Sequence, residues 1–314
     1  SGTATIGSAN AGSYTITNLS GISIADGSGG TASNYTLTGG THNFTVNRRA
    51  VSVSGTRLYD ATTNAVASDL STHANLVGSE TLNLSGTGTI ASKNVGSNKT
   101  VSVGTLALAD GSNGGLAANY TLSGGTHQLT VNQRPLNATL ARQYDGTTTA
   151  AGSDLSSFDA LQGGETLTMT GSGTAASANV ANGIAMSSNG TLALADGTGL
   201  ASNYSLNSTV INIAQRVLNS SGSKTYDANT DALAGAITLS NLVSGEALNH
   251  SGTATIGSAN AGSYTITNLS GISIADGSGG TASNYTLTGG THNFTVNRRA
   301  VSVSGTRLYD ATTN

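Results

Sequence analysis

The sequence predicts a mainly β protein made of tandem domains of about 83 residues, joined end to end in a rod. Each domain is expected to hold a β-grasp-like sheet and one short helix. Landmark residues return at regular intervals, and short runs of alternating apolar and polar residues lie between them. The 43 glycines separate these runs, often in pairs that are typical of turns. An immunoglobulin-like sandwich is the alternative. A continuous β-solenoid is less favoured, because its coils would repeat every ~20–25 residues.

Internal repetition is the strongest signal in the chain. Residues 1–64 and 251–314 are identical. Within this long repeat, shorter landmarks return once in each domain. They are an Asn-Tyr pair, a Tyr-Asp pair and a glutamate after glycine, at Asn34-Tyr35, Asn119-Tyr120 and Asn203-Tyr204, at Tyr59-Asp60, Tyr144-Asp145 and Tyr226-Asp227, and at Glu80, Glu165 and Glu246. Such identity is typical of a fibre or stalk, because changing the number of repeats changes only its length.

The boundaries between repeats are predicted at a segment that contains an arginine. Three such segments align, and they contribute Arg49, Arg134 and Arg216. Pro135 lies in one of them, where the start of a strand tolerates proline. The predicted units are residues 1–48, which complete a repeat, the whole repeats 49–133, 134–215 and 216–298, and residues 299–314, which begin another.

Strands are predicted wherever apolar residues alternate with period two. Phe44 and Val46 form one such pair, and Val51 and Val53 form another. Alternation of this kind indicates a strand with one buried face. Many short strands separated by glycine are therefore expected in every repeat.

One segment in each repeat has a helical pattern instead. Over residues 68–77, Leu70, Ala74 and Val77 fall on one helical face, and residues 153–161 show a similar pattern. Each segment begins with a serine, Ser68 or Ser153, as a candidate N-cap, and Gly78 or Gly163 follows its end. The pattern predicts a helix of about two to three turns.

The composition excludes several classes of function. Charged residues make up 9% of the chain and the net charge is −3, so no basic surface is expected to bind nucleic acid. No apolar run is long enough to insert this segment into a membrane. Cysteine is absent, which excludes disulfides and thiol nucleophiles. The chain does not start with Met, so export signals are expected outside these residues.

The order of the landmarks carries a resemblance. Arg142-Gln143-Tyr144-Asp145 opens a repeat, a Gly-Glu pair follows, and an Asn-Tyr-Thr/Ser segment comes near its end. This order resembles the YDG-type repeats of large filamentous-haemagglutinin-like adhesins, which Gram-negative bacteria secrete through a partner protein. The resemblance implies an extracellular, cell-surface location, export through an outer-membrane transporter and a role in adhesion or biofilm matrix. It implies no catalytic residue. Only Asp145 is followed by glycine here; alanine follows the other Tyr-Asp pairs.

The Tyr-Asp pair is the first candidate site. Its aspartates, Asp60, Asp145 and Asp227, are expected to accept backbone N–H bonds in a turn, and the tyrosines to be buried. Calcium binding is the alternative, although calcium needs about six to eight oxygen ligands and no dense aspartate cluster is present. No other metal or cofactor is expected.

The recurring arginines and asparagines are the second candidate. Arg49, Arg134 and Arg216 are expected to pair with carboxylates at the joints between repeats and to stiffen them. Binding of an acidic glycan is the alternative. Each Asn-Tyr pair is also followed by Thr or Ser, which makes it a weak candidate for N-glycosylation.

These observations predict a structural protein rather than an enzyme. No Ser, His and Asp constellation repeats with the domains, so nucleophilic catalysis is not expected. The expected function is a stalk or fibre of a bacterial surface adhesin or extracellular matrix scaffold, whose partners are neighbouring copies of itself. The alternative is a multivalent carbohydrate-binding module that contacts cell-surface or matrix polysaccharide. That module would need exposed aromatic side chains, and tryptophan is absent.

Overall fold

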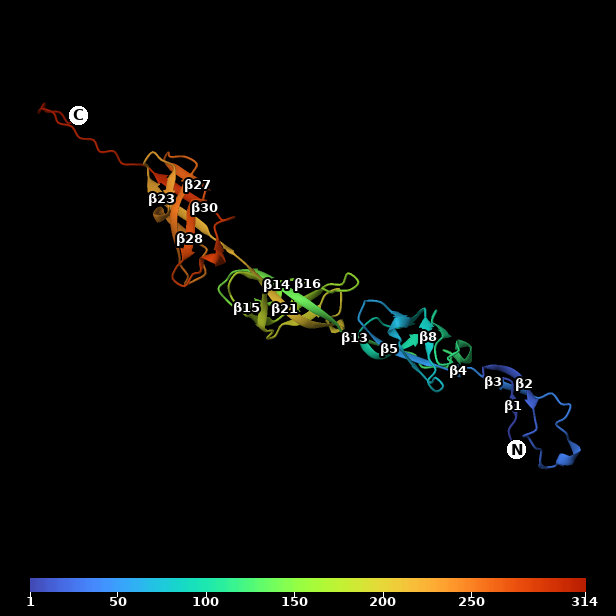
Figure 1. The fold of residues 1–314 in the computed structure, drawn as a ribbon. Coiled ribbons are helices and arrows are strands. Elements are labelled where there is room, and N and C mark those ends of the chain that lie inside the picture. Colours follow the sequence, from blue (N-terminus) through green and yellow to red (C-terminus); the bar gives the residue numbers. More distant parts are fainter. The chain divides into compact units, whose positions relative to one another are not determined.

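The computed structural model describes residues 1–314, and its regular structure is almost entirely β. The helices are single 3₁₀ turns of three residues. None of them has the length or the apolar character needed to cross a membrane. Figure 1 shows the strands gathered into separate sheets that follow one another along the chain. The predicted mainly β fold with tandem repeats is confirmed.

The chain divides into two compact units. Unit 1 contains Ser1–Leu136, Ala160–Leu167 and Asp196–Ser205, and unit 2 contains Asn137–Asp159, Thr168–Ala195 and Leu206–Asn314. The division passes through the repeat 134–215. Two loops of that repeat therefore belong to unit 1, together with the repeat that precedes them.

Unit 1 begins with a small antiparallel sheet and continues with a complete repeat. The small sheet has the order β1-β2-β3, with β1 at Thr5–Ile6, β2 at Gly12–Asn18 and β3 at Asn43–Val46, and η1 is Ala32–Asn34. The repeat has a six-stranded sheet of order β6-β9-β10-β13-β5-β7. Its elements are β4 (Arg49–Ala50), β5 (Ser52–Leu58), β6 (Asn64–Val66), η2 (Ala67–Asp69), β7 (Thr72–Ala74), β8 (Leu82–Ser85), β9 (Thr87–Ile90), β10 (Gly96–Ser102), β11 (Ala107–Asp110), η3 (Ala117–Asn119), β12 (Tyr120–Thr121) and β13 (Gln128–Asn132). β8 pairs with β11, and β4 pairs with β12.

Most of the second repeat and all of the third lie in unit 2. The second repeat has the order β15-β18-β19-β21-β14-β16, and the third has β24-β26-β27-β30-β23-β25, with β28 paired to β26. The second repeat contains β14 (Arg134–Gln143), β15 (Thr149–Ala151), η4 (Gly152–Asp154), β16 (Leu155–Phe158), β17 (Leu167–Thr170), β18 (Ser172–Ala175), β19 (Ala181–Ser188), β20 (Ala193–Asp196), η5 (Ala201–Asn203) and β21 (Tyr204–Ala214). The third contains β22 (Arg216–Val217), β23 (Asn219–Thr225), β24 (Asp231–Leu233), η6 (Ala234–Ala236), β25 (Ile237–Ser240), β26 (Leu248–Ile256), β27 (Gly262–Asn268), β28 (Ile272–Asp276), η7 (Ala282–Asn284), β29 (Tyr285–Thr286) and β30 (His292–Asn297). The three repeats thus share one sheet order, which is not the stacked coil of a solenoid.

The first and last long strands of a repeat lie side by side and parallel. β5 pairs with β13 and β23 pairs with β30, while the other pairs in these two sheets are antiparallel. The alternating apolar residues of this pair form the core, and Val51, Val53, Leu129 and Val131 are all buried. A Cβ at Gly55 would lie 1.7 Å from the carbonyl oxygen of Asp69. Only glycine lets β5 pass η2 so closely.

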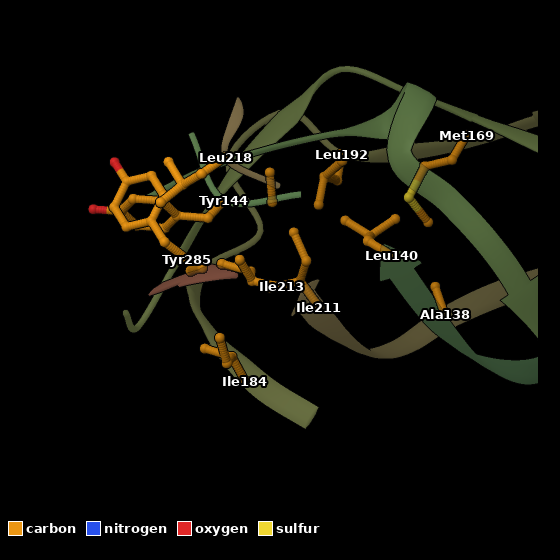
Figure 2. Packing of buried hydrophobic residues seen from close by; sticks show 12 residues of the cluster. Ala138, Leu140, Tyr144, Met169, Ile184, Leu192, Ile211, Ile213, Leu218 and Tyr285 are labelled. Atoms are coloured by element: carbon orange, nitrogen blue, oxygen red, sulfur yellow. The ribbon is translucent and has the colours of Figure 1, made fainter. Parts of the chain in front are cut away.

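In unit 2, one apolar cluster contains residues of both the second and the third repeat. Figure 2 shows Leu140, Leu192 and Ile211 side by side in this cluster, with the rings of Tyr144 and Tyr285 at one end of it. The two tyrosine hydroxyls point away from the apolar side chains. The cluster therefore ends in polar groups at the place where the two repeats meet.

The predicted short helix is wrong. The 3₁₀ turns η2 and η4 last only three residues, and the chain then enters β7 and β16. These strands pair with β5 and β14 at the edge of each sheet. A helix of two to three turns is marginal by itself, whereas the sheet edge offers unpaired backbone groups. Leu70 is buried, as its pattern indicated, but the 3₁₀ turn and not a helix places it there.

Two segments of identical sequence differ in their surroundings. Tyr285 and Phe294 are each 1% exposed, whereas Tyr35 and Phe44, at the same positions in residues 1–48, are 69% and 52% exposed. In the third repeat, β23 pairs with β30 and lies beside Phe294. In residues 1–48, β3 has only β2 as a neighbour. The first part of a repeat is therefore what buries the second part.

These identical segments provide a matched pair of substitutions. Phe294→Ala should lower the free energy of unfolding of the third repeat by about 3–5 kcal/mol, because a buried ring is lost. Phe44→Ala should cost less than about 1 kcal/mol, because that ring is half exposed. Hydrogen exchange of residues 216–250, together with urea unfolding of the whole chain, measures both effects. Equal costs would contradict this account of burial.

Candidate functional site: the joints between repeats

The recurring side chains gather at two joints, one in each unit. The first joint, in unit 1, consists of Tyr59, Lys93, Arg134, Glu165 and Tyr204. The second joint, in unit 2, consists of Tyr144, Arg216, Glu246 and Tyr285. Each joint combines residues of two successive repeats, and every contact described below lies within one unit.

A glutamate shared by two tyrosines is at the centre of the first joint. Tyr59 donates a hydrogen bond to Glu165 Oε1 (2.6 Å), and Tyr204 donates one to Glu165 Oε2 (2.8 Å). The tyrosine rings meet edge to face, with centroids 5.3 Å apart. Lys93 Nζ lies 2.6 Å from Glu165 Oε1. The carboxylate is thus bonded from the preceding repeat by Tyr59 and Lys93, and from its own repeat by Tyr204.

The second joint repeats this arrangement without a lysine. Tyr144 donates to Glu246 Oε1 and Tyr285 donates to Glu246 Oε2, both at 2.6 Å. The ring centroids are 5.4 Å apart at an interplanar angle of 79°. Alanine stands where the first joint has Lys93, since Ala178 occupies that position in the next repeat. The tyrosine pair and the glutamate are therefore the constant part of a joint.

The parallel strand pair positions the first tyrosine of each joint. The N–H of Tyr59, directly after β5, donates to Asn132 O at the end of β13 (2.9 Å). Tyr144 makes the same bond to Ala214 O (2.9 Å). The ends of the two strands thus direct this ring out of its own repeat and onto the next one.

The recurring arginines bind carbonyl groups and not carboxylates. Arg134 Nε donates to Tyr59 O (2.7 Å), and Arg216 Nη1 donates to Tyr144 O (3.4 Å). Arg49 Nε donates to Asn75 O (2.8 Å). The predicted arginine–carboxylate pairs are therefore wrong. The glutamates are bonded to tyrosines and the Tyr-Asp aspartates to other cations, and the arginines donate instead to backbone carbonyls and to the amide oxygens of Asn75 and Asn241.

The asparagine of each Asn-Tyr pair also links two repeats. Asn203 Oδ1 accepts the N–H of Val95 (2.9 Å), and Asn203 Nδ2 donates to Asn94 Oδ1 (3.0 Å). Equivalent bonds join Asn284 to Val180 and Asn179, and Asn119 to Ala11 and Asn10. Asn203 and Asn284 are buried, so a glycan cannot be attached to them in the folded chain. Asn34 is exposed in its incomplete repeat.

The aspartates of the Tyr-Asp pairs lie in turns beside these joints. Asp145 accepts the N–H of Thr147 (2.9 Å) and forms an ion pair with Arg142. Asp60 bonds Thr62 and Arg57, and Asp227 bonds Asn229 and Lys224. The residue after the aspartate has a positive φ in all three turns: Ala61 64°, Gly146 77° and Ala228 66°. The backbone conformation is therefore one that favours glycine, and alanine adopts it at two of the three positions.

The model of the YDG domain matches residues 41–128, 126–211 and 214–293. This chain belongs to the YDG domain family. No curated protein matches the chain. The three matched ranges overlap the predicted repeats 49–133, 134–215 and 216–298, whose boundaries remain predictions.

The middle YDG domain contributes to a joint at both of its ends, through Glu165 and Tyr204 at one and Tyr144 at the other. Some of the residues in the joints were missed from the sequence. Asn10, Asn94 and Asn179 had no predicted role, and neither had the glutamates. The available signal was positional: these asparagines occupy the same place in successive domains. Tyr226, the last Tyr-Asp tyrosine in a folded domain, is 38% exposed. The residues that follow it at 299–314 form no strand and supply no glutamate.

The buried hydrogen bonds of the joints shift the pKa values of their members. Burial, followed by the neighbouring glutamate, raises the pKa of Tyr204 and of Tyr285 to about 12. Burial alone would raise the pKa of Glu165, but the hydrogen bonds from Lys93, Tyr59 and Tyr204 outweigh it and lower that pKa. Both joints are therefore most stable when their tyrosines are protonated, and the first joint also when Glu165 is ionised.

The alternative of a calcium site at the Tyr-Asp pairs is not accompanied by a cluster of ligand side chains in this structure. The His, Asp and Glu side chains form no group of three or more that could hold an ion. The aspartates named for calcium each face a cationic side chain instead. Calcium binding stays an untested alternative.

High pH should lower the free energy of unfolding of the YDG domains, because it deprotonates Tyr204 and Tyr285. Their folded pKa of about 12 lies above the ordinary 10.0, so their contribution to stability is complete below about pH 10 and is lost as the pH rises towards about 12. Urea unfolding across this range, with tyrosinate absorbance recorded in parallel, measures the loss. A Tyr204→Phe, Tyr285→Phe variant should lose less stability over the same range. Tyr309→Phe, in the exposed tail, is the control and should behave like the unaltered chain.

The hydrogen bond between domains can be isolated by comparing two glutamates. Glu80 bonds only Tyr120 of its own domain, whereas Glu165 bonds Tyr204 of its own domain and also Tyr59 and Lys93 of the preceding one. The Glu165 side chain is only 8% exposed. Glu165→Ala should therefore lower the free energy of unfolding by about 1.5–3 kcal/mol more than Glu80→Ala. Urea unfolding of both variants tests this, and equal costs would show that the joint contributes nothing.

Proposed function

We propose that this chain is a structural stalk or fibre segment of a repetitive bacterial surface adhesin or extracellular matrix scaffold, with no catalytic role. The observation that carries the proposal is the recurrence of one joint. The same glutamate, shared by two tyrosines, and the same asparagine pair connect successive domains in both units. The recurring side chains are thus used to hold one domain to the next.

The contacts at the joints are of a kind that resists mechanical force. Domains joined by a bare linker move freely by default. Here the two tyrosines donate hydrogen bonds to a largely buried carboxylate, and their rings are in contact. An arginine of the following repeat also donates to the backbone oxygen of the first tyrosine. Bonds to charged groups are about twice as strong as neutral ones. A chain held in this way resists bending and extension at every joint, and the proposed rod arrangement rests on this resistance.

Location and export are proposed from the domain family. We infer an extracellular, cell-surface position and secretion through an outer-membrane transporter, by way of regions outside these residues. The absence of cysteine is compatible with this position, because the fold uses hydrophobic cores and joints in place of disulfides. Neither a cofactor nor an enzymatic activity is part of the proposal.

The alternative, a carbohydrate-binding module, receives less support from the aromatic residues. Tyr59, Tyr144, Tyr204 and Tyr285 are buried, and they bind glutamates. They are therefore occupied in holding domains together and present no ring face to a sugar. The stalk remains the function that the geometry supports best.

Shortening the chain in its host tests the proposal. Deleting a repeat of about 250 residues from the surface protein should shorten the filament and weaken attachment between cells, because length is the property that repeats supply. Electron microscopy and an attachment assay under flow measure these effects. A Glu165→Ala, Glu246→Ala variant keeps every domain but weakens both joints, and it should reduce attachment under flow only. If the deletion left both filament length and attachment unaltered, the stalk proposal would be wrong.

A further inference from the structure

The strands that begin and end a repeat are hydrogen-bonded neighbours that run in the same direction. In the first repeat, residues 49–133, β5 pairs with β13 over five residue pairs. In the third repeat, residues 216–298, β23 pairs with β30 over six, and Figure 1 shows these two strands side by side. Because the strands of each pair are parallel, the chain enters the pair at one end and leaves it at the opposite end.

Tension on the chain therefore loads this strand pair in shear. It pulls the first strand back at its N-terminal end and the last strand forward at its C-terminal end, along the strand axis. Sliding two strands past each other stretches all of their hydrogen bonds together, whereas pulling them apart from one end breaks the bonds one after another. Only Gln133 lies between β13 and β14, and only Gln215 between β21 and β22, so little chain can extend before tension reaches a strand.

Further backbone bonds lengthen the ladder at both of its ends. In the first repeat, the N–H of Tyr59 donates to Asn132 O (2.9 Å) after β5, and the N–H of Val51 donates to Thr121 O (2.8 Å) before it. The short parallel pair of β4 and β12 continues the contact. The third repeat has the equivalent bonds, from Tyr226 N–H to Asn297 O (2.9 Å) and from Leu218 N–H to Thr286 O (2.8 Å).

A buried histidine at the start of the last strand adds one more bond to the first strand. In the first repeat, the N–H of Val53 donates to His127 Nδ1 (3.3 Å), and His127 Nε2 bonds Leu122 O (2.8 Å). In the third repeat, His292 Nδ1 bonds Ser220 Oγ (2.9 Å). Both histidines are buried, so these bonds are shielded from water.

We propose that the first and third repeats are mechanical clamps, which resist tension along the chain by shear between their first and last strands. The elements that bear the force are β5 with β13 and β23 with β30, together with the histidine and tyrosine bonds at their ends. In contrast to the joints, which hold one domain to the next, a clamp keeps a single domain folded under load.

The role of the clamps in the host rests on the proposed stalk function, because a stalk under load is pulled along its chain. The clamps themselves follow from strand direction and can be tested on the isolated protein. A weak clamp would leave the stalk proposal standing on its joints. A repeat deletion without effect in the host would refute the stalk and leave the clamps standing.

Pulling the first repeat in two directions with optical tweezers tests the proposal. The full chain has no cysteine, so introduced cysteines attach the handles at chosen points. Arg48→Cys, Asn132→Cys places them at opposite ends of the strand pair and loads it in shear. Leu58→Cys, Asn132→Cys places them on two residues that pair at one end of the ladder, and so unzips it. All three side chains are exposed.

The two handle positions should give different unfolding forces for the same domain. At one loading rate, the shear force should be at least about twice the unzipping force, because the ladder shares the load only in shear. Equal forces, or a lower force in shear, would overturn the proposal.

The histidine bond can be tested with a residue that the chain already uses, since the second repeat has Thr209 at this position. With the shear handles at constant force, His127→Thr should raise the unfolding rate roughly five- to tenfold, because a bond between the clamp strands is lost. It should change the unzipping force little, because unzipping starts at the other end of the ladder. His73→Thr, on the edge strand β7, is the control and should unfold at the unaltered rate.

Urea unfolding establishes that both histidine variants are folded before they are pulled. An unaltered rate in His127→Thr, or an equal rise in His73→Thr, would overturn the histidine's part in the clamp. The comparison of the two pulling directions keeps His127 in place, so it decides the proposal even if His127→Thr fails to fold.

Discussion

The pairing of the first and last long strands of each domain is the constraint on which the rest of the structure depends. It joins residues about 75 positions apart in sequence, and closing such a loop has an entropic cost that the buried strands must offset. The identical segments show its effect directly. With the first strand present, Tyr285 and Phe294 are buried; without it, Tyr35 and Phe44 are exposed. The same pairing places the Tyr-Asp tyrosine at the end of the sheet, where the next domain begins.

The joints follow from that placement. A tyrosine projecting beyond its own sheet must find a partner for both its ring and its hydroxyl. The next domain supplies both, an edge-to-face ring and one oxygen of a glutamate. One carboxylate has two oxygens, so it can bond one tyrosine from each domain. This explains why the glutamate and both tyrosines recur together.

Low charge and small residues fit this design. Few charged groups are available. Some of those near the joints pair within one turn, as Arg142 does with Asp145 and Lys224 with Asp227, and Lys93 pairs with Glu165 of the next domain. Glycine allows close approaches such as that of Gly55 to the carbonyl of Asp69. Small apolar cores and recurrent polar contacts between neighbouring domains therefore stabilise the chain. A domain of this kind depends on its own first strand and on its neighbours for full burial, as repeat proteins do.

The sequence by itself determined the repeats, the mainly β class and the turn at each Tyr-Asp pair, because these depend on periodicity and on local backbone chemistry. It did not determine that residues 68–77 avoid a helix, since that depends on the open edge of β5, with which residues 72–74 pair. Nor did it determine the partners of Arg134 or Glu165. Both arginine–carboxylate and tyrosine–carboxylate pairs suit these residue types. Only the tertiary structure places Tyr59 and Tyr204, and not Arg134, against the Glu165 carboxylate. Contacts between residues distant in sequence depend on which strands pair, and no local pattern records that choice.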